Sequence, residues 1–157
     1  MISSLIKKKK IIFILGPTAI GKSEVAFYLA KKLKGEVISC DSMQVYKGMP
    51  IITSKPPSAL MKKVKHHLIG TVALNNNYDA SFFRRDALKK ISGIIRKGKV
   101  PIVAGGTGLY ASVLINGIFE GGAKDAAIRN KLYKIAGNNG CLYLHKCLMR
   151  VDPKAAD

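Results

Sequence analysis

The sequence predicts an α/β fold in which helices flank a parallel β-sheet. Three short, mostly apolar runs rich in Val and Ile, at 11–15, 36–40 and 100–104, are typical of strands buried on both faces. Segments with apolar residues at helical spacing lie between these runs, as expected when helices connect parallel strands. A chain of 157 residues that is 48% hydrophobic is long enough for one domain with a substantial core.

The first strand is expected at 11–15, directly after a run of lysines. Residues 16–23 form a glycine-containing loop, and apolar residues then recur at helical spacing until Gly35 ends the pattern. A second strand at 36–40 ends at Asp41. We expect the two strands and their connecting helix to form one right-handed βαβ unit.

The middle of the chain supplies further elements. The stretch 48–58 contains prolines without a sustained period and is expected to be a loop, and 67–72 is a candidate short strand. Apolar residues keep a helical period over 82–95 until Gly98 closes the pattern, and 100–104 is the next strand. A short helix is expected at 110–114.

The C-terminal part is expected to be helical. Gly121 and Gly122 break the pattern before a helical region at 125–149, which is interrupted at 137–140. Pro153 follows Asp152 as the first residue of a further helix would. The expected strands are fewer than the roughly five or six of an average sheet, so we interpret later strands as missing.

The charge balance favours a polyanionic partner. Lys and Arg number 27 against 9 Asp and Glu, which gives a formal net charge of +18 at pH 7. Nucleic acid is the first candidate, although a lysine-rich solvated surface would account for much of the same excess.

No segment predicts membrane insertion or secretion. The longest apolar run, 11–15, is far shorter than the roughly 20 residues of a membrane-spanning helix, and the N-terminus lacks the cleavage site of a signal peptide. The 3 cysteines are irregularly spaced, which indicates reduced thiols. We therefore expect a cytoplasmic protein. Cys141, His145 and Cys147 lack the fourth ligand of a typical zinc site.

A phosphate-binding loop follows the first strand. Its residues fit the pattern G-x-x-x-x-G-K-[ST]: Gly16, Pro17, Thr18, Ala19, Ile20, Gly21, Lys22 and Ser23. The backbone N–H groups and the helix N-terminus surround phosphate oxygens, Lys22 adds a charge, and the Ser23 hydroxyl is a candidate ligand of Mg²⁺. The position between a strand and a helix argues against a chance turn and predicts a P-loop NTPase-like sheet. The motif does not say which diphosphate or triphosphate is bound.

Asp41 ends the second strand, at the sheet edge where ligands bind in α/β folds. An aspartate there is typical of the Mg²⁺ site of nucleotide hydrolases and kinases, which makes this class the main enzymatic alternative. However, Asp41, Ser42 and Gln44 place a carboxylate, a hydroxyl and an amide close together in the chain. That arrangement departs from the hydrolase pattern.

Several segments together resemble the tRNA dimethylallyltransferase family, also called tRNA isopentenyltransferases. They occur in the family's order: GPTA and GKS within 16–23, DSMQVYKGM at 41–49, KP at 55–56, HHLI at 66–69 and GGTGLY at 105–110. The similarity also reaches Asp125, Arg129 and Leu132, and then 152–156. It covers nearly the whole chain from Ile11 and is weakest after Gly121.

The resemblance implies that the loop holds the diphosphate of dimethylallyl diphosphate rather than ATP. Lys22, the loop amides and Mg²⁺ near Ser23 would stabilise negative charge on the departing diphosphate. It also implies that Asp41 accepts a proton from the exocyclic amine of adenine as that nitrogen attacks the allylic carbon. The alternatives for Asp41 are a metal ligand or a cap of the following turn.

The acceptor that the resemblance implies is the adenine on the 3′ side of the tRNA anticodon, a loop base that must be splayed out to react. The residues expected to contact the tRNA are Asp41, Ser42, Met43, Gln44, Thr107 and Arg129. Thr107 is also a candidate catalytic residue; alternatively, it is only a turn residue between glycines. Arg129 could instead lie on a solvated helix face. His66 and His67 are expected to be structural.

The resemblance divides the chain into a P-loop α/β core at 1–120 and part of a helical insertion domain at 121–157. The family carries further helices and strands beyond its Asp-Pro segment, so we interpret the chain as a fragment and expect a monomer. Three other functions stay open: transfer to free adenylate, as in adenylate isopentenyltransferases, a small-molecule kinase or NTPase, and a remnant that binds phosphates or RNA without turnover.

Overall fold

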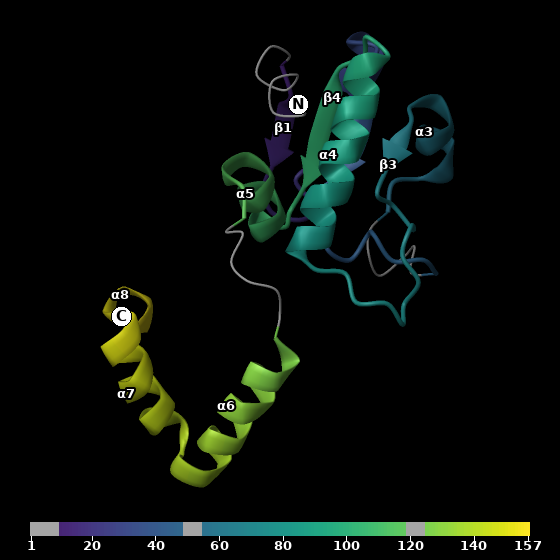
Figure 1. The fold of residues 1–157 in the computed structure, drawn as a ribbon. Helices are drawn as coiled ribbons and strands as arrows, with labels where there is room; N and C mark the ends of the chain where they lie inside the picture. Colours follow the sequence, from purple (N-terminus) through teal and green to yellow (C-terminus); the bar gives the residue numbers. More distant parts are fainter. Residues whose placement is uncertain (1–9, 49–54, 119–124) are drawn as a thin grey trace. The chain divides into compact units, whose positions relative to one another are not determined.

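A computed structural model of the chain describes residues 10–48, 55–118 and 125–157 (Figure 1). The chain divides into two compact units, Met1–Ile118 and Phe119–Asp157, and each is described by itself. The first unit is the α/β core and the second is helical. The proposed boundary at 120 and the assignment of the second unit to an insertion domain stay predictions.

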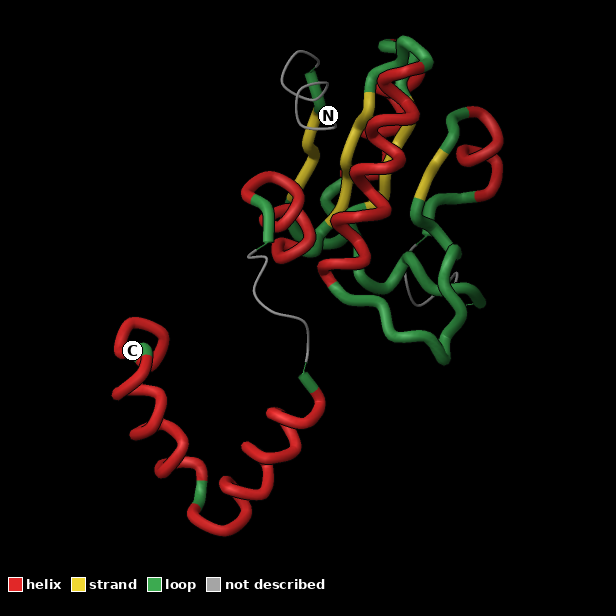
Figure 2. The backbone as a smooth tube through the Cα atoms, viewed as in Figure 1, coloured by secondary structure: helices red, strands yellow, loops and turns green. Residues whose placement is uncertain are grey.

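A four-stranded parallel sheet forms the centre of the first unit (Figure 2). The strands are β1 (Ile12–Leu15), β2 (Glu36–Ser39), β3 (His66–His67) and β4 (Pro101–Gly105), in the order β1-β4-β2-β3. This confirms the predicted parallel sheet. The first two strands do not pair with each other in the βαβ unit expected from the sequence. Instead, β4 lies between β1 and β2 and pairs with both.

Helices cover both faces of this sheet. They are α2 (Lys22–Lys32) on one face and α4 (Ala80–Arg96) with α5 (Gly108–Asn116) on the other, whereas α3 (Ser58–Lys63), which has no buried residue, precedes the edge strand β3. Successive side chains of a strand point to opposite faces. Ile38 and Val103 accordingly pack with Phe83 of α4, whereas Val37 and Ile102 pack with Ala26 of α2. The central strands are therefore buried on both sides, as their composition predicts.

The structure corrects three local predictions. The strand expected at 67–72 is limited to His66–His67, because Leu68 and Gly70 have φ angles of 60° and 59°, which end the extended conformation. The helix expected at 110–114 spans Gly108–Asn116. The predicted loop at 48–58 ends where α3 begins at Ser58, and its residues 49–54 lie outside the described part of the chain.

The second unit consists of α6 (Ala126–Asn139), α7 (Cys141–Val151) and α8 (Pro153–Ala156). Asp125 caps α6 by accepting hydrogen bonds from Ala127 N and Ile128 N, and Asp152 caps α8. The interruption predicted at 137–140 is narrower, since only Gly140, with φ 81°, separates α6 from α7. None of the helices within the described ranges combines the length and apolar composition that crossing a membrane requires.

A buried carboxylate lies at the amino-terminal edge of the sheet. The Glu36 side chain is 1% exposed and contacts Lys99 Nζ at 2.8 Å, His67 Nε2 at 2.7 Å and Lys97 Nζ at 3.8 Å. Burial by itself would raise the pKa of Glu36, but the hydrogen bonds with Lys99 and His67 and the charge of Lys97 outweigh burial and hold the pKa at about 2. Desolvation lowers the pKa of His67 despite its contact with Glu36.

We expect the chain to lose stability in acid. Because the pKa of Glu36 falls from 4.5 to about 2 on folding, its stabilisation is complete above pH 4.5 and is lost as the pH falls toward 2. This contribution is about 3 kcal/mol. The lowered pKa of His67 acts in the same direction, since the unfolded chain binds that proton more readily.

Urea unfolding at a series of pH values measures this dependence. Glu36→Gln should flatten the fall of the unfolding free energy below pH 4.5, whereas Glu24→Gln, at an exposed glutamate, should leave it unchanged. The same acid dependence in the wild-type chain and in Glu36→Gln would contradict this account.

Candidate functional site

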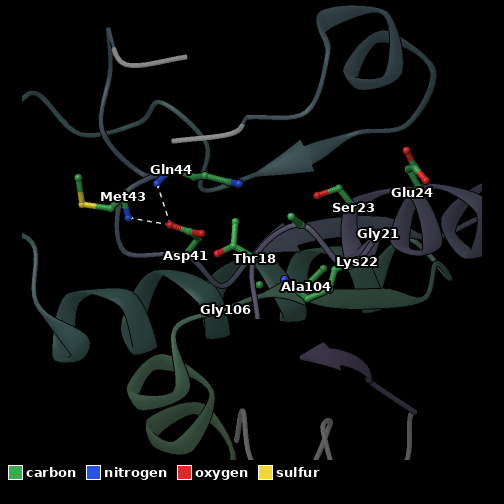
Figure 3. A pocket seen from close by; sticks show the side chains of 12 residues that line it. Thr18, Gly21, Lys22, Ser23, Glu24, Asp41, Met43, Gln44, Ala104 and Gly106 are labelled. Carbon is green, nitrogen blue, oxygen red and sulfur yellow. Dashed lines mark hydrogen bonds between the residues drawn. The ribbon is translucent and has the colours of Figure 1, made fainter. Parts of the chain in front are cut away.

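A cavity of about 510 Å³ opens at the carboxyl edge of the parallel strands (Figure 3). Three segments line it: the loop and first helical turn after β1, the turn after β2, and the end of β4 with the glycine that follows. This edge is where open α/β sheets bind ligands. The fold thus brings together residues that lie more than 60 positions apart in the sequence.

The loop after β1 has the conformation that a phosphate site requires. Gly21 is the N-cap of α2 in the left-handed region, with φ 84°, and Val25 N donates to its carbonyl at 3.1 Å. Lys22 Nζ donates to Pro17 O, so its side chain folds back across the loop. The first residues of α2, where a helix has N–H groups without intrahelical partners and its positive dipole end, line the cavity.

The oxygen donors at the cavity fit a weakly held Mg²⁺ ion. Ser23, Glu24 and Asp41 line the cavity, and the described residues contain no group of three or more His, Cys, Asp or Glu side chains placed to hold a metal. Mg²⁺ is commonly bound by one or two protein oxygens together with substrate phosphates, so a larger protein site is not needed. Ser23 remains the proposed ligand.

Asp41 is held in place by the turn that it begins. Its Oδ1 accepts hydrogen bonds from Met43 N at 2.8 Å and from Gln44 N at 3.2 Å (Figure 3). This is the turn-capping role considered from the sequence, and the half-buried carboxylate also lines the cavity. Capping fixes the position of the side chain, so the two roles are compatible.

Thr107 connects the loop after β4 to the same turn. Its Oγ1 accepts a hydrogen bond from Ser42 N at 3.0 Å and lies 3.4 Å from Ser42 Oγ, and its own N–H donates to Cys40 O at 3.1 Å. Thr107 is not among the described residues that line the cavity. These contacts favour a positioning role, and the catalytic role stays a prediction.

Ser39 is a site residue that the sequence analysis missed. It is buried in β2, and its Oγ donates to Gln44 Oε1 at 2.9 Å. This bond fixes the orientation of an amide that lines the cavity. The available signal was a hydroxyl in a mostly apolar strand, two residues before Asp41.

The remaining predicted tRNA contacts fall into two groups. Met43 and Gln44 line the cavity, and the Met43 side chain is 47% exposed there. Arg129 lies on α6 in the second unit, which is described separately from the cavity. Its contact with tRNA stays a prediction.

The comparisons with known proteins agree with the motifs. Residues 44–157 match the family model described as IPP transferase. The chain belongs to this family. A curated tRNA dimethylallyltransferase from Aquifex aeolicus is 54% identical over 147 residues, 94% of this chain and 48% of that protein. The corresponding protein of Pelagibacter ubique is 44% identical and is covered to the same 48%. The chain spans about half the length of the curated relatives it matches.

Solved structures of IPP transferases share the fold. The tRNA isopentenylpyrophosphate transferase of Bacillus halodurans matches with a TM-score of 0.70 and 41% identity, covering 95% of this chain and 50% of that one. A eukaryotic dimethylallyltransferase solved while acting on tRNA matches with a TM-score of 0.77 and 33% identity, covering 95% and 37%. The predicted family and the P-loop NTPase-like fold are confirmed.

Gly105 is required where β4 ends. A Cβ atom on this residue would lie 2.1 Å from Cys40 O and 2.4 Å from Cys40 C, both backbone atoms. We expect Gly105→Ala to lower the free energy of unfolding by about 1–3 kcal/mol, because the two strand ends must separate. Urea unfolding measures the loss.

Gly93→Ala is the matched control for this variant. Gly93 lies inside α4 with no heavy atom within 4 Å of an added Cβ, so alanine should stabilise the chain by up to about 1 kcal/mol. If Gly105→Ala proved as stable as Gly93→Ala, the close contact between the strand ends would not exist in solution.

Proposed function

We propose that this IPP transferase chain supplies the donor site and the general base for transfer of a dimethylallyl group to tRNA. The donor is dimethylallyl diphosphate, and the acceptor is N6 of the adenine 3′-adjacent to the anticodon. One observation carries the proposal: the phosphate-binding loop and the Asp41 turn line the same cavity. The names of the curated relatives support it.

The P-loop side of the cavity would bind and activate the donor. The loop N–H groups and Lys22 hold the diphosphate, and their charge favours its departure from the allylic carbon. When bound, Mg²⁺ would neutralise further charge on that diphosphate, and Ser23 is the side chain that would hold it. Donor activation therefore depends on groups contributed by 16–23 and on the ion that Ser23 would hold.

The Asp41 side of the cavity would receive the adenine. As the N6 nitrogen forms a bond to the allylic carbon, the bond from that carbon to the diphosphate oxygen breaks, and an N6 proton passes to the Asp41 carboxylate. Hydrogen bonds from Met43 N and Gln44 N to Oδ1 hold this carboxylate in the turn. Ser42, Met43 and Gln44 would contact the splayed base, and Thr107 would position the turn.

Asp41→Asn tests the base. The amide oxygen of Asn can still accept from Met43 N and Gln44 N, so the turn is kept while the proton acceptor is lost. We expect the rate of transfer to fall by about 10²–10⁴-fold. The full chain is incubated with Mg²⁺, dimethylallyl diphosphate and unmodified tRNA, and the added isopentenyl unit is located by mass spectrometry.

Asp157→Asn, at an exposed position in the second unit, is the control and should keep the wild-type rate. Undiminished transfer by Asp41→Asn would remove Asp41 as the base. If the wild-type chain bound tRNA but gave no product, this polypeptide would be a binding remnant, and product from free AMP alone would indicate an adenylate acceptor.

Lys22→Met tests the donor site. Because a hydrogen bond to a charged group contributes about 1.5–3 kcal/mol, we expect dimethylallyl diphosphate to bind roughly tenfold more weakly or worse. Isothermal titration calorimetry with Mg²⁺ measures the affinity, and Lys47→Met at an exposed lysine is the control. Release of phosphate from ATP by the wild-type chain, without prenyl transfer, would favour the kinase or NTPase alternative.

Two broader expectations accompany the proposal. A monomer is expected, and light scattering coupled to size-exclusion chromatography measures the mass of the full chain in solution. We also expect the protein in the cytoplasm, where a tRNA-modifying enzyme with reduced thiols would act.

A further inference from the structure

Lysines precede every strand at the edge of the sheet opposite the cavity. All strands are parallel, so their amino termini share one edge. Lys10, Lys34, Lys65 and Lys99 each lie one or two residues before β1, β2, β3 and β4, and all four are exposed. Neighbouring strands lie about 4.8 Å apart, so the four residues form a short row across the sheet.

Helix ends add further cations to the same edge. α2, α3 and α4 each lead into the start of a strand, and their last turns carry Lys31 and Lys32, Lys62 and Lys63, and Arg96, with Lys97 as the C-cap of α4. These six residues and the four lysines before the strands are called the basic edge. Cations near helix C-termini are favoured by the helix dipole. Lys34, Lys65 and Lys99 lie two or three residues beyond the ends of α2, α3 and α4, so the same helix dipoles favour them as well.

The acidic residues of the first unit are segregated from this edge. Within its described residues, Glu24 lies in the first turn of α2, Asp41 ends β2, Asp79 caps α4 and Asp86 lies in the first half of α4. Glu36 alone is at the basic edge, where it is buried and already contacts Lys97 and Lys99. The exposed charge of this edge is therefore positive only.

We propose that the basic edge is a second RNA-binding surface, which contacts the phosphate backbone of an RNA at the end of the sheet opposite the cavity. A row of lysines suits phosphates rather than bases, and the centroid of the exposed aromatic ring of Tyr28 lies 5.5 Å from Lys32 Nζ of the basic edge. A membrane surface fits less well, because the exposed large apolar side chains near this end of α2, Tyr28 and Leu33, are outnumbered by the described cations of the basic edge. The inference is independent of the chemistry proposed for the cavity.

The test uses the full chain and a fluorescein-labelled oligouridylate of about 12 nucleotides, which contains no adenine to enter the cavity. Lys34, Lys62, Lys63 and Lys65 are changed to Gln together, since they are exposed and take no part in the Glu36 contacts. Fluorescence anisotropy gives the association constant over a range of KCl concentrations.

We expect binding by this variant to be about tenfold weaker or worse at low salt. The slope of log K against log[salt] should become shallower by up to about 3, because each lost phosphate contact on a single strand removes about 0.7 from it. The control changes Lys131, Lys134, Lys146 and Lys154 of the second unit to Gln, which alters the net charge equally. Its slope should stay close to that of the wild-type chain.

Equal losses in the two variants would overturn the proposal, because the effect would then be one of net charge. A second outcome would also overturn it. In that outcome the edge variant keeps its oligouridylate binding but loses binding to phosphatidylserine-containing vesicles, while the control variant still binds them. The edge variant should keep the wild-type urea midpoint and its affinity for dimethylallyl diphosphate. The wild-type chain could fail to transfer a prenyl group while the edge variant still shows weaker oligouridylate binding. That result would count against the proposed function and not against the basic edge.

Discussion

The close approach of β2 and β4 at their carboxyl ends positions every part of the cavity. Cys40 N donates to Ala104 O at 2.8 Å, and Gly105 lies so near the Cys40 carbonyl that no side chain fits between the strands. The next residue, Gly106, lies close to the P-loop, since a Cβ added to Gly106 would lie 3.3 Å from Gly16 O. Because β4 also pairs with β1, the glycine-containing loop at 16–23 and the turn that carries Asp41 are fixed to one strand.

The two edges of the sheet have opposite chemical characters for a structural reason. In a parallel sheet all strand carboxyl ends meet at one edge and all amino ends at the other. The helices that return the chain begin toward the carboxyl edge of the strands, where their N–H groups attract carboxylate caps such as Asp79, and they end at the basic edge, where lysines are favoured. Lys34, Lys65 and Lys99 follow the ends of these helices and share this polarity, and Lys10 adds a cation before β1.

The features that could be predicted from the sequence are those encoded locally. The strand, loop and helix around 16–23 and the position of Asp41 follow from periodicity and from a motif with a physical mechanism. The insertion of β4 between β1 and β2 could not be predicted, because strand order is decided by long-range packing. The strand expected at 67–72 was too long, since Leu68 and Gly70 adopt left-handed conformations that an apolar run does not reveal. The hydrogen bond from Ser39 to Gln44 could not be predicted from the sequence either, because it joins side chains on a strand and a turn.

Asp41 illustrates why a structural role and a chemical role need not compete. A carboxylate on a mobile loop would sample many orientations, and a general base is effective only within hydrogen-bonding distance of the proton it takes. Here the turn amides of Met43 and Gln44 bind Oδ1, Ser39 holds the Gln44 side chain, and Thr107 holds Ser42 from the neighbouring loop. Each contact removes a degree of freedom from the Asp41 turn before any ligand arrives. The order of this turn comes from the same parallel sheet that carries the loop at 16–23, so both halves of the proposed reaction depend on one sheet.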